Sequence, residues 1–322
     1  MRIFVAGATG AVGRSLVPAL VDAGHSVIGM TRSPEKAGAI RRAGAEPVVA
    51  DGLNARAVRA AVISARPDVV IDQMTDLATA TDLRHFDRAF ANTNRLRTDG
   101  TDHLLAAARE AGAKRFIAQS FCGWTFGRDS DAIETGTDAP DPDPPRELRR
   151  TLNALRYLEQ TVTTSMEPEG VVLRYGSFYG PGTGMFSRAM TDEVRHRRVP
   201  LIGTGAGWWS FVHVDDAASA AVAAIERGRP REIYNIVDDD PAPVSEWLPA
   251  LAGILGAKPP IHIPAWVGRL LAGEHMVSMM TQVRAASNDR AKQELGWQPA
   301  YPSWRRGFAE AARQPVERRI AA

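Results

Sequence analysis

A glycine-spaced segment near the start of the chain, Gly7-x-x-Gly10-x-x-Gly13, restricts the fold more than any other feature. It follows a short apolar run, Arg2–Ala6, that suits a buried parallel strand, and it leads into Val12–Gly24, which is apolar at helical spacing. In such a strand, turn and helix, Gly7 makes the tight turn, Gly10 admits phosphates to the helix N-terminus, and Gly13 allows close packing. The segment therefore predicts a site for the pyrophosphate of a nicotinamide dinucleotide.

The composition is that of an ordinary globular protein and excludes several kinds of partner. The 322 residues contain 39 basic and 37 acidic side chains, a net charge of +2, and only four of the scattered basic residues are lysines. We therefore expect no nucleic-acid partner. A single cysteine excludes an internal disulfide framework and a cysteine-based metal site, and no metal is expected.

The distribution of apolar residues bears on where the chain works. No apolar run approaches the roughly 18 residues of a membrane-spanning helix, so no membrane segment is expected. A strand that begins at Arg2 leaves no room for a signal peptide. We expect a cytoplasmic protein whose partner is a small-molecule substrate.

Apolar, strand-like runs alternate with Ala-rich helical stretches such as Arg95–Ala111. This alternation predicts an α/β fold with a doubly wound parallel sheet, whose ligands bind beyond the carboxyl ends of the strands. The expected strands are Arg2–Ala6, His25–Met30, Glu46–Val49, Val69–Ile71, Phe116–Gln119, Gly170–Arg174 and Ile233–Ile236.

The regular pattern ends near Arg174. The segment Tyr179-Gly-Pro-Gly-Thr-Gly184 is typical of a loop, and the Pro-rich, Trp-containing stretch from Pro241 onward indicates a smaller, irregular lobe. We predict a cofactor-binding core over residues 1–178, to which residues 210–237 return. A substrate-binding lobe is expected mainly within residues 179–322.

Four motifs along the chain together carry a family resemblance. They are Gly7-x-x-Gly10-x-x-Gly13, Tyr179-Gly-Pro-Gly182, Phe211-Val-His-Val-Asp-Asp216 and Leu295-Gly-Trp-x-Pro299. In this order they resemble the extended short-chain dehydrogenase/reductase family, which includes NAD-dependent epimerases and dehydratases. The resemblance covers nearly the whole chain and implies a Rossmann core of about seven strands with a C-terminal substrate lobe. It also implies a mainly structural role for His213, with Asp215 or Asp216 as the cap of a helix that begins at Ala217.

The end of the second expected strand bears on the choice of cofactor. NAD sites usually place an acid there for the ribose 2′-hydroxyl, whereas Met30-Thr31-Arg32-Ser33 carries none. Arg32 can bind a 2′-phosphate through two N–H groups, and Thr31 and Ser33 can donate hydrogen bonds, so NADP(H) is favoured. If Arg32 only stacks on the adenine, NAD(H) is also acceptable.

The resemblance extends the expected cofactor site to further segments. Asp51-Gly52-Leu53 resembles the family's adenine-contacting segment. The complete set of expected cofactor contacts is Gly7, Thr9, Gly10, Ala11, Val12, Gly13, Thr31, Arg32, Ser33, Asp51, Gly52, Leu53, Gln73, Tyr175 and Ser177.

The chain lacks the Tyr-x-x-x-Lys pair on which the family's reductive chemistry rests, because none of its five tyrosines has a lysine four residues later. The family often carries a Glu four residues after its Lys. Aligning that residue with Glu159 places Thr151 at the tyrosine position and Leu155 at the lysine position. The family's catalytic Ser/Thr position corresponds to Cys122. Ser120 is the expected hydrogen-bond donor to a carbonyl, while Cys122 is either a substrate contact or a small packing residue.

The expected substrate site is apolar. Family members that act on nucleotide sugars carry Arg two residues before the aromatic of Phe211-Val-His-Val, where this chain has Trp209. An indole in place of a phosphate-binding charge suits an aromatic or polycyclic ligand, although such rings can equally form core between the lobes. The expected substrate contacts are Cys122, Trp124, Tyr179, Met185 and Trp209.

Three functions are compatible with these residues. The first is an atypical NADPH-dependent reductase of a ketone or quinone-like carbonyl on a bulky aromatic natural product, similar to polyketide-tailoring ketoreductases, with a substrate hydroxyl supplying the proton. The second, a nucleotide-sugar epimerase or dehydratase, is disfavoured by the missing pair and by Trp209. The third is a non-catalytic NADP(H)-sensing protein, which an intact glycine turn without a catalytic pair fits equally well.

Overall fold

The computed structural model describes residues 1–77, 86–123 and 141–313. Its centre is a seven-stranded sheet in the order β11-β6-β5-β4-β1-β2-β3, with every neighbouring pair parallel. This confirms the predicted doubly wound α/β fold, and all seven expected strands belong to this one sheet. The strands are β1 (Arg2–Ala6), β2 (Ser26–Thr31), β3 (Glu46–Val49), β4 (Val69–Asp72), β5 (Arg115–Phe121), β6 (Glu169–Tyr175) and β11 (Ile233–Ile236).

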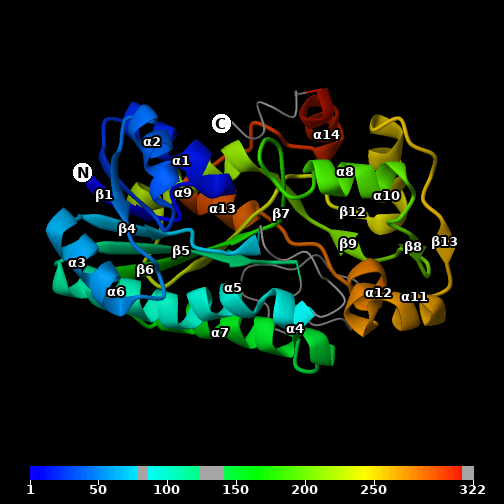
Figure 1. The fold of residues 1–322 in the computed structure, drawn as a ribbon, viewed down its shortest axis with the longest axis horizontal. Helices are drawn as coiled ribbons and strands as arrows, with labels where there is room; N and C mark the ends of the chain where they lie inside the picture. Colours follow the sequence, from blue (N-terminus) through cyan, green and yellow to red (C-terminus); the bar gives the residue numbers. More distant parts are fainter. Residues whose placement is uncertain (78–85, 124–140, 314–322) are drawn as a thin grey trace.

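Helices cover both faces of the sheet, so that the core has three layers (Figure 1). On one face, alternate strand residues such as Ile3, Val5 and Leu173 pack against α1 (Ala11–Asp22) and α9 (Val214–Arg227). On the other, residues such as Phe4 and Phe116 pack against helices from the first half of the chain. These are α3 (Ala55–Ala65), α6 (Thr101–Glu110) and α7 (Arg149–Thr163), and α2 (Ala37–Arg42) connects β2 to β3.

The helix expected over Arg95–Ala111 is interrupted. It consists of α5 (Ala91–Arg95), a π-helical turn at Leu96–Gly100, and α6, and the short α4 (Phe86–Ala89) precedes it. A π turn shifts the register of the side chains by one residue, which brings Arg97 into the interior. The sequence gives no sign of this interruption, because apolar spacing in the segment remains close to the helical period.

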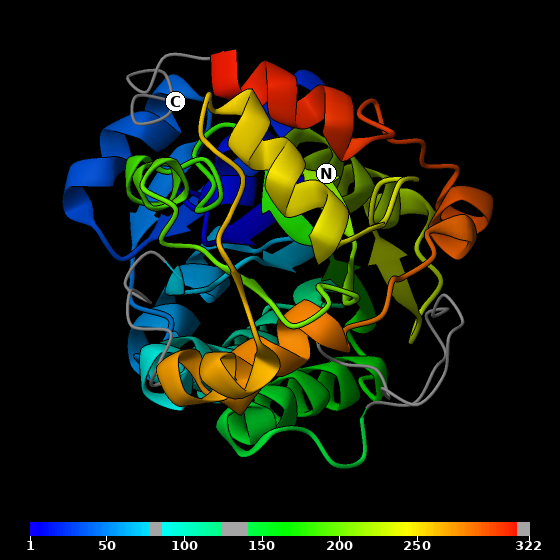
Figure 2. The same cartoon turned by 90° about the vertical axis from the view of Figure 1, so that its right-hand side faces the viewer.

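Most residues from Ser177 onward form a smaller lobe around a separate core that includes Phe186, Trp247, Trp304 and Phe308. Figure 2 faces this lobe and shows α14, in red, beside α10, in yellow. Its helices are α8 (Arg188–Arg195), α10 (Val244–Ile254), α11 (Ala265–Ala272), α12 (Glu274–Thr281) and α14 (Trp304–Arg313). Its short strand pairs are β7 (Ser177–Tyr179) with β10 (Phe211–His213), β9 (Trp208–Trp209) with β12 (Ala242–Pro243), and β8 (Leu201–Ile202) with β13 (His262–Ile263).

Two later segments rejoin the sheet. The first, α9 and β11, packs on α1 and extends the sheet edge beside β6. The second is α13 (Asp289–Leu295), whose Ala291 and Leu295 join the sheet's core together with Trp297. None of the helices formed by the described residues is long and apolar enough to cross a lipid bilayer.

Candidate cofactor and active site

The glycine turn lies between the carboxyl end of β1 and the start of α1. Gly7 has a φ of +82°, and a Cβ there would lie 2.5 Å from the Gln73 carbonyl oxygen, so a side chain is excluded. A Cβ on Gly13 would lie 2.4 Å from the Gly7 carbonyl oxygen, which agrees with the close packing expected of that position. The first turn of α1 carries no acidic residue, so its N-terminus suits an anion. The turn thus has the expected local geometry, and cofactor contact at Ala11 and Val12 remains a prediction.

The turn also lies where the strand order reverses, since β1 has β4 on one side and β2 on the other. Ligands of doubly wound sheets bind at this point. The hydroxyl oxygens of Thr9 and Thr31 lie 3.2 Å apart, which brings the end of β2 beside the turn, and Ser33 N–H donates to Thr31 Oγ1. The amide N–H of Leu53 donates to Asp51 Oδ1 at 2.9 Å, and Gly52 between them is buried against Met74.

Arg32 is held by a partner that the sequence did not reveal. Its Nη2 and Nη1 atoms donate to Asp76 Oδ1 and Oδ2 at 2.7 and 3.2 Å. This hydrogen bond raises the pKa of Arg32, and the negative charges of Asp76 and Asp51 raise it further. Partial burial of the guanidinium acts in the opposite direction but is outweighed. Asp76 follows β4, more than 40 residues further along the chain, so no local spacing could indicate the pair.

Gln73 and Tyr175, two of the expected cofactor contacts, have buried side chains that bond to each other. The ring of Tyr175 is fully buried, its hydroxyl donates to the Ala217 carbonyl at 3.3 Å, and burial raises its pKa. Gln73 Nε2 donates to that hydroxyl at 3.4 Å, while Gln73 Oε1 has no hydrogen-bond partner among the described residues. Tyr175 is thus a buried residue in this structure, and its contact with a cofactor stays a prediction. Ser177 remains half-buried at the start of β7.

The expected role of Ser120 needs correction. Its hydroxyl donates to Glu159 Oε1 at 2.6 Å, and Arg174 donates to the same carboxylate from Nε at 2.7 Å and from Nη2 at 2.6 Å. All three residues are buried, with Ser120 only 1% exposed. Since the one hydroxyl proton of Ser120 is already donated, this side chain is not positioned to polarise a substrate carbonyl. The three residues form a structural network between β5, β6 and α7.

The positions matched to the family's Tyr and Lys are interior. Thr151 is fully buried, and its hydroxyl accepts a hydrogen bond from Asn94 Nδ2 at 3.1 Å. Leu155 belongs to an apolar cluster with Phe86 and Phe90. Neither residue can therefore act as a general acid with a lowered pKa.

Arg97 and Asn94 are polar residues that sequence reasoning missed. Within the described part of the chain, Arg97 Nη1 and Asn94 Oδ1 are buried without a hydrogen-bond partner. Burial lowers the pKa of Arg97 to about 10, against the opposing charge of Glu159. They face the interior because α5 and the π turn place them there.

Cys122 is a packing residue in this structure. It is 1% exposed and lies with Val237 and Ala286 in a small apolar cluster. Burial raises the pKa of its thiol to about 12, so the reactive thiolate is disfavoured. This corrects the expected substrate contact at Cys122, whereas the contact expected at Trp124 lies outside the described residues.

The expected aromatic contacts in the lobe belong to its core. Tyr179 is fully buried, with its ring centroid 5.2 Å from that of His213 and 5.3 Å from that of Phe308. Trp209 is half-buried, 4.9 Å from Trp247 between centroids, and its indole N–H donates to the Met279 carbonyl at 2.9 Å. Met185 packs partly buried against the same core. Tyr179 and most of the Trp209 ring therefore pack in the core of the lobe, which is the alternative left open for these aromatic residues, and substrate contact at either residue stays a prediction.

His213 caps α9, a role that had been expected of Asp215 or Asp216. Its Nδ1 accepts a hydrogen bond from Asp215 N–H at 3.3 Å, and its ring stacks on Tyr301 at 3.8 Å. The Asp216 carboxylate instead accepts hydrogen bonds from the backbone of Ala300 and Tyr301, which ties the lobe to α9. His213 is structural, as the resemblance implied.

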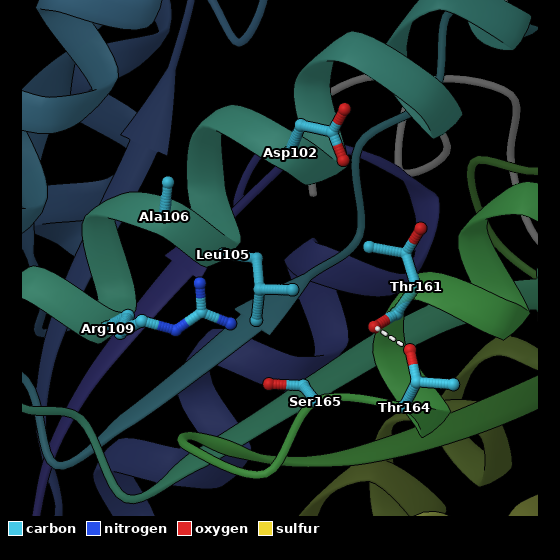
Figure 3. A pocket seen from close by; sticks show the side chains of 7 residues that line it. All are labelled: Asp102, Leu105, Ala106, Arg109, Thr161, Thr164 and Ser165. Atoms are coloured by element: carbon cyan, nitrogen blue, oxygen red, sulfur yellow. Dashed lines mark hydrogen bonds between the residues drawn. The ribbon is translucent and has the colours of Figure 1, made fainter.

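A hollow of about 320 Å³ lies elsewhere, between α6 and the end of α7 (Figure 3). None of the predicted site residues lines it. Among the described residues, no group of His, Cys, Asp or Glu side chains is arranged to hold a metal ion. The lining residues of the hollow are Asp102, Leu105, Ala106, Arg109, Thr161, Thr164 and Ser165.

Comparison with known proteins agrees with this architecture. The family model described as "NAD dependent epimerase/dehydratase family" matches residues 3–237. The chain is similar to a 3-diazoavenalumate denitrifying reductase from a Streptomyces species, with 44% identity over 313 residues that cover 96% of this chain and 99% of that protein. It is also similar to a 4-hydroxy-2-methyl-3-oxo-4-farnesyl-3,4-dihydroquinoline-1-oxide ketoreductase of Stigmatella aurantiaca, with 28% identity over 324 residues and 92% of each chain covered.

Among solved structures, the UDP-glucose 4-epimerase of Thermotoga maritima superposes with a TM-score of 0.77, at 22% identity and with 100% of both chains covered. At this identity the likeness confirms the fold. The two relatives named as reductases support an oxidoreductase. The family model, which covers most of the chain, establishes that the protein belongs to the NAD-dependent epimerase/dehydratase family.

Proposed function

We propose that the chain is an NAD(P)H-dependent reductase whose aromatic substrate accepts hydride without a proton from a protein side chain. One observation carries the proposal: the turn for the cofactor is intact, while the positions of the family's acid and its partner hold the buried Thr151 and Leu155. When bound, the nicotinamide supplies the hydride. The chain's own contribution is to bind and orient the two reactants in a site from which water is excluded.

An aromatic diazonium group is the acceptor that best fits such a site. Hydride addition to its terminal nitrogen forms an N–H bond and gives a neutral aryl diazene. The diazene then loses N₂ as its hydrogen replaces the nitrogen on the ring carbon, so one hydride is consumed and no proton is needed. The relative with 44% identity is named as a denitrifying reductase of a diazo compound, which supports this acceptor class.

The test is turnover of an ortho-hydroxyarenediazonium salt with NADPH or NADH that carries deuterium at C4. We expect N₂ release, oxidised cofactor and slower turnover with the deuterated than with the ordinary cofactor, because the C4–H bond breaks. The diazene N–D exchanges with water, so the label need not be retained at the ring carbon that carried nitrogen. A reaction without protein, and one with a Gly7→Val variant that fills the turn, measure the background reduction. If the wild-type protein reduces the diazonium salt no faster than these two controls, the proposal is refuted.

A carbonyl beside a hydroxyl group is the second acceptor class, supported by the relative named as a ketoreductase. Here the neighbouring hydroxyl protonates the developing alkoxide. Methylating that hydroxyl should lower kcat by about 10²-fold, the usual contribution of a positioned acid, and should change KM much less. Turnover of ketones but not of diazonium salts would favour this class.

The other two functions make different predictions. A nucleotide-sugar epimerase needs charged contacts to phosphates, whereas the indole N–H of Trp209 is already donated to Met279. An NADP(H)-sensing protein would bind the cofactor tightly and turn over neither a diazonium salt nor a ketone. Cofactor binding measured beside turnover separates this last function from both reductase activities.

A further inference from the structure

The ion pair between Arg32 and Asp76 spans the glycine turn. Arg32 follows β2 and Asp76 follows β4, and β1 lies between these strands in the sheet. Because the turn continues from the carboxyl end of β1, the pair crosses the edge of the sheet where a dinucleotide is expected. The Gln73 N–H donates to the Ala6 carbonyl at 2.9 Å, which keeps the chain after β4 close to the turn.

The carboxylate of Asp76 is fixed from a second element. Asn92 Nδ2 donates to Asp76 Oδ2 at 2.6 Å, and the Asp76 amide N–H donates to Thr93 Oγ1 at 3.0 Å. Asp76 is 8% exposed, whereas the side chain of Arg32 is 52% exposed. The acid is therefore also held by residues of α5, and Arg32 is the more exposed partner of the pair.

This arrangement changes the charge that a cofactor meets. A lone Arg32 would present one positive charge and all five guanidinium N–H groups to a ribose 2′-phosphate. Here Asp76 accepts from both Nη1 and Nη2, and Asp51 is close enough to act on the same guanidinium. A 2′-phosphate thus meets a largely neutralised cation, while a 2′-hydroxyl can donate to a carboxylate.

We propose that Asp76 sets the choice between NADH and NADPH by pairing with the Nη1 and Nη2 groups of Arg32 and placing a carboxylate beside the ribose 2′ position. Asp76 supplies from the loop after β4 the acid that the end of β2 lacks. The inference rests on the nicotinamide cofactor of the proposed function, but it concerns binding rather than turnover.

The test is direct titration of the full chain by calorimetry with NADH, NADPH, 5′-AMP and 2′,5′-ADP. The two adenosine nucleotides differ only in the 2′-phosphate and so isolate this subsite. Asp76→Asn keeps the shape and the contact with the Thr93 hydroxyl but removes the charge. It should raise the preference for NADPH over NADH, and for 2′,5′-ADP over 5′-AMP, by about tenfold or more.

Arg32→Ala should move both preferences in the opposite direction, and circular dichroism checks that this variant is folded. The matched control is Glu110→Gln. Glu110 forms a two-contact ion pair with Arg59 on the outer surface, where the Arg59 side chain is 61% exposed, and the substitution removes the charge of that pair. This control should leave both preferences unchanged. Lys36, the other cation of the turn after β2, stays in every variant.

The outcomes separate the two proposals. If neither cofactor binds the wild-type chain, the proposed function and this inference both fail. If both cofactors bind but Asp76→Asn leaves both preferences within about twofold of the wild type, this inference alone fails. Should Asp76→Asn unfold, as judged by circular dichroism, an unchanged preference in Arg32→Ala overturns the inference, because Asp76 acts through Arg32.

Discussion

The hydroxyl of Ser120 has one proton, and the Glu159 carboxylate accepts it at 2.6 Å. For this reason Ser120→Ala should retain turnover within about tenfold, and it should lower the free energy of unfolding by roughly 1.5–3 kcal/mol, the net value of one hydrogen bond to a charged group. Steady-state kinetics and urea unfolding of the same preparation give both quantities. Loss of turnover with intact cofactor binding would instead identify Ser120 as the general acid.

Asp72 is a buried residue whose ionisation should be visible in stability. It lies at the end of β4, accepts from Met74 N–H at 3.0 Å, and burial raises its pKa from 3.8 to about 7. Between about pH 4 and pH 7 the folded chain therefore keeps a proton that the unfolded chain has lost, so this residue's contribution to stability falls as the pH rises.

Asp72→Asn tests this contribution, because the amide oxygen can accept the same hydrogen bond and does not titrate. The wild type minus variant difference in the free energy of unfolding should fall between pH 5 and pH 8, as measured by urea unfolding at each pH. A difference that stays constant over this range would show that Asp72 is ionised throughout it.

At the scale of elements, α7 is joined to the sheet by one buried ion pair. Arg174 on β6 meets Glu159 on α7 at 2.6 Å, and both side chains are buried. Glu159→Gln should cost roughly 3–5 kcal/mol of stability, because it leaves a buried guanidinium without its counter-charge. In thermal and urea unfolding the matched control is Glu310→Gln, in the exposed pair with Arg306, which should cost less than about 0.5 kcal/mol. Equal losses in the two variants would contradict the assignment of the buried network.

The elements also show what periodicity can and cannot reveal. The apolar runs located all seven strands of the main sheet, four of them lengthened or shifted by one or two residues at an end, because burial on both faces marks such strands directly. The π turn at Leu96–Gly100 was not visible, because it alters register without altering composition. The partners of Arg32, Ser120 and Thr151 were missed for a related reason: each lies 39 to 57 residues away along the chain.

At the scale of the whole molecule, the core was more predictable than the lobe. The glycine turn needs residues without a Cβ at fixed positions, and glycines at that spacing can be recognised in the sequence. Aromatic residues, in contrast, suit a pocket wall and a core equally well. Tyr179 and Trp209 were expected in the substrate site, and the lobe uses most of their surface to pack around Phe211 and Trp247. The lobe's stability and the site's shape therefore depend on the same rings.

Trp209 gives the sharpest test of that dependence. Trp209→Arg would place a charge among Trp247 and Phe211 and would remove the hydrogen bond to the Met279 carbonyl. It should destabilise the protein by roughly 2–4 kcal/mol. Trp209→Phe, which keeps a ring and loses only the N–H, should cost about 1 kcal/mol. Because the glycine turn lies in the core rather than the lobe, calorimetric Kd values for NADH and NADPH should stay within about twofold in both variants while the protein is folded. A Trp209→Arg variant that unfolds like the wild type but has a raised KM would show that the indole faces the substrate rather than the lobe's interior.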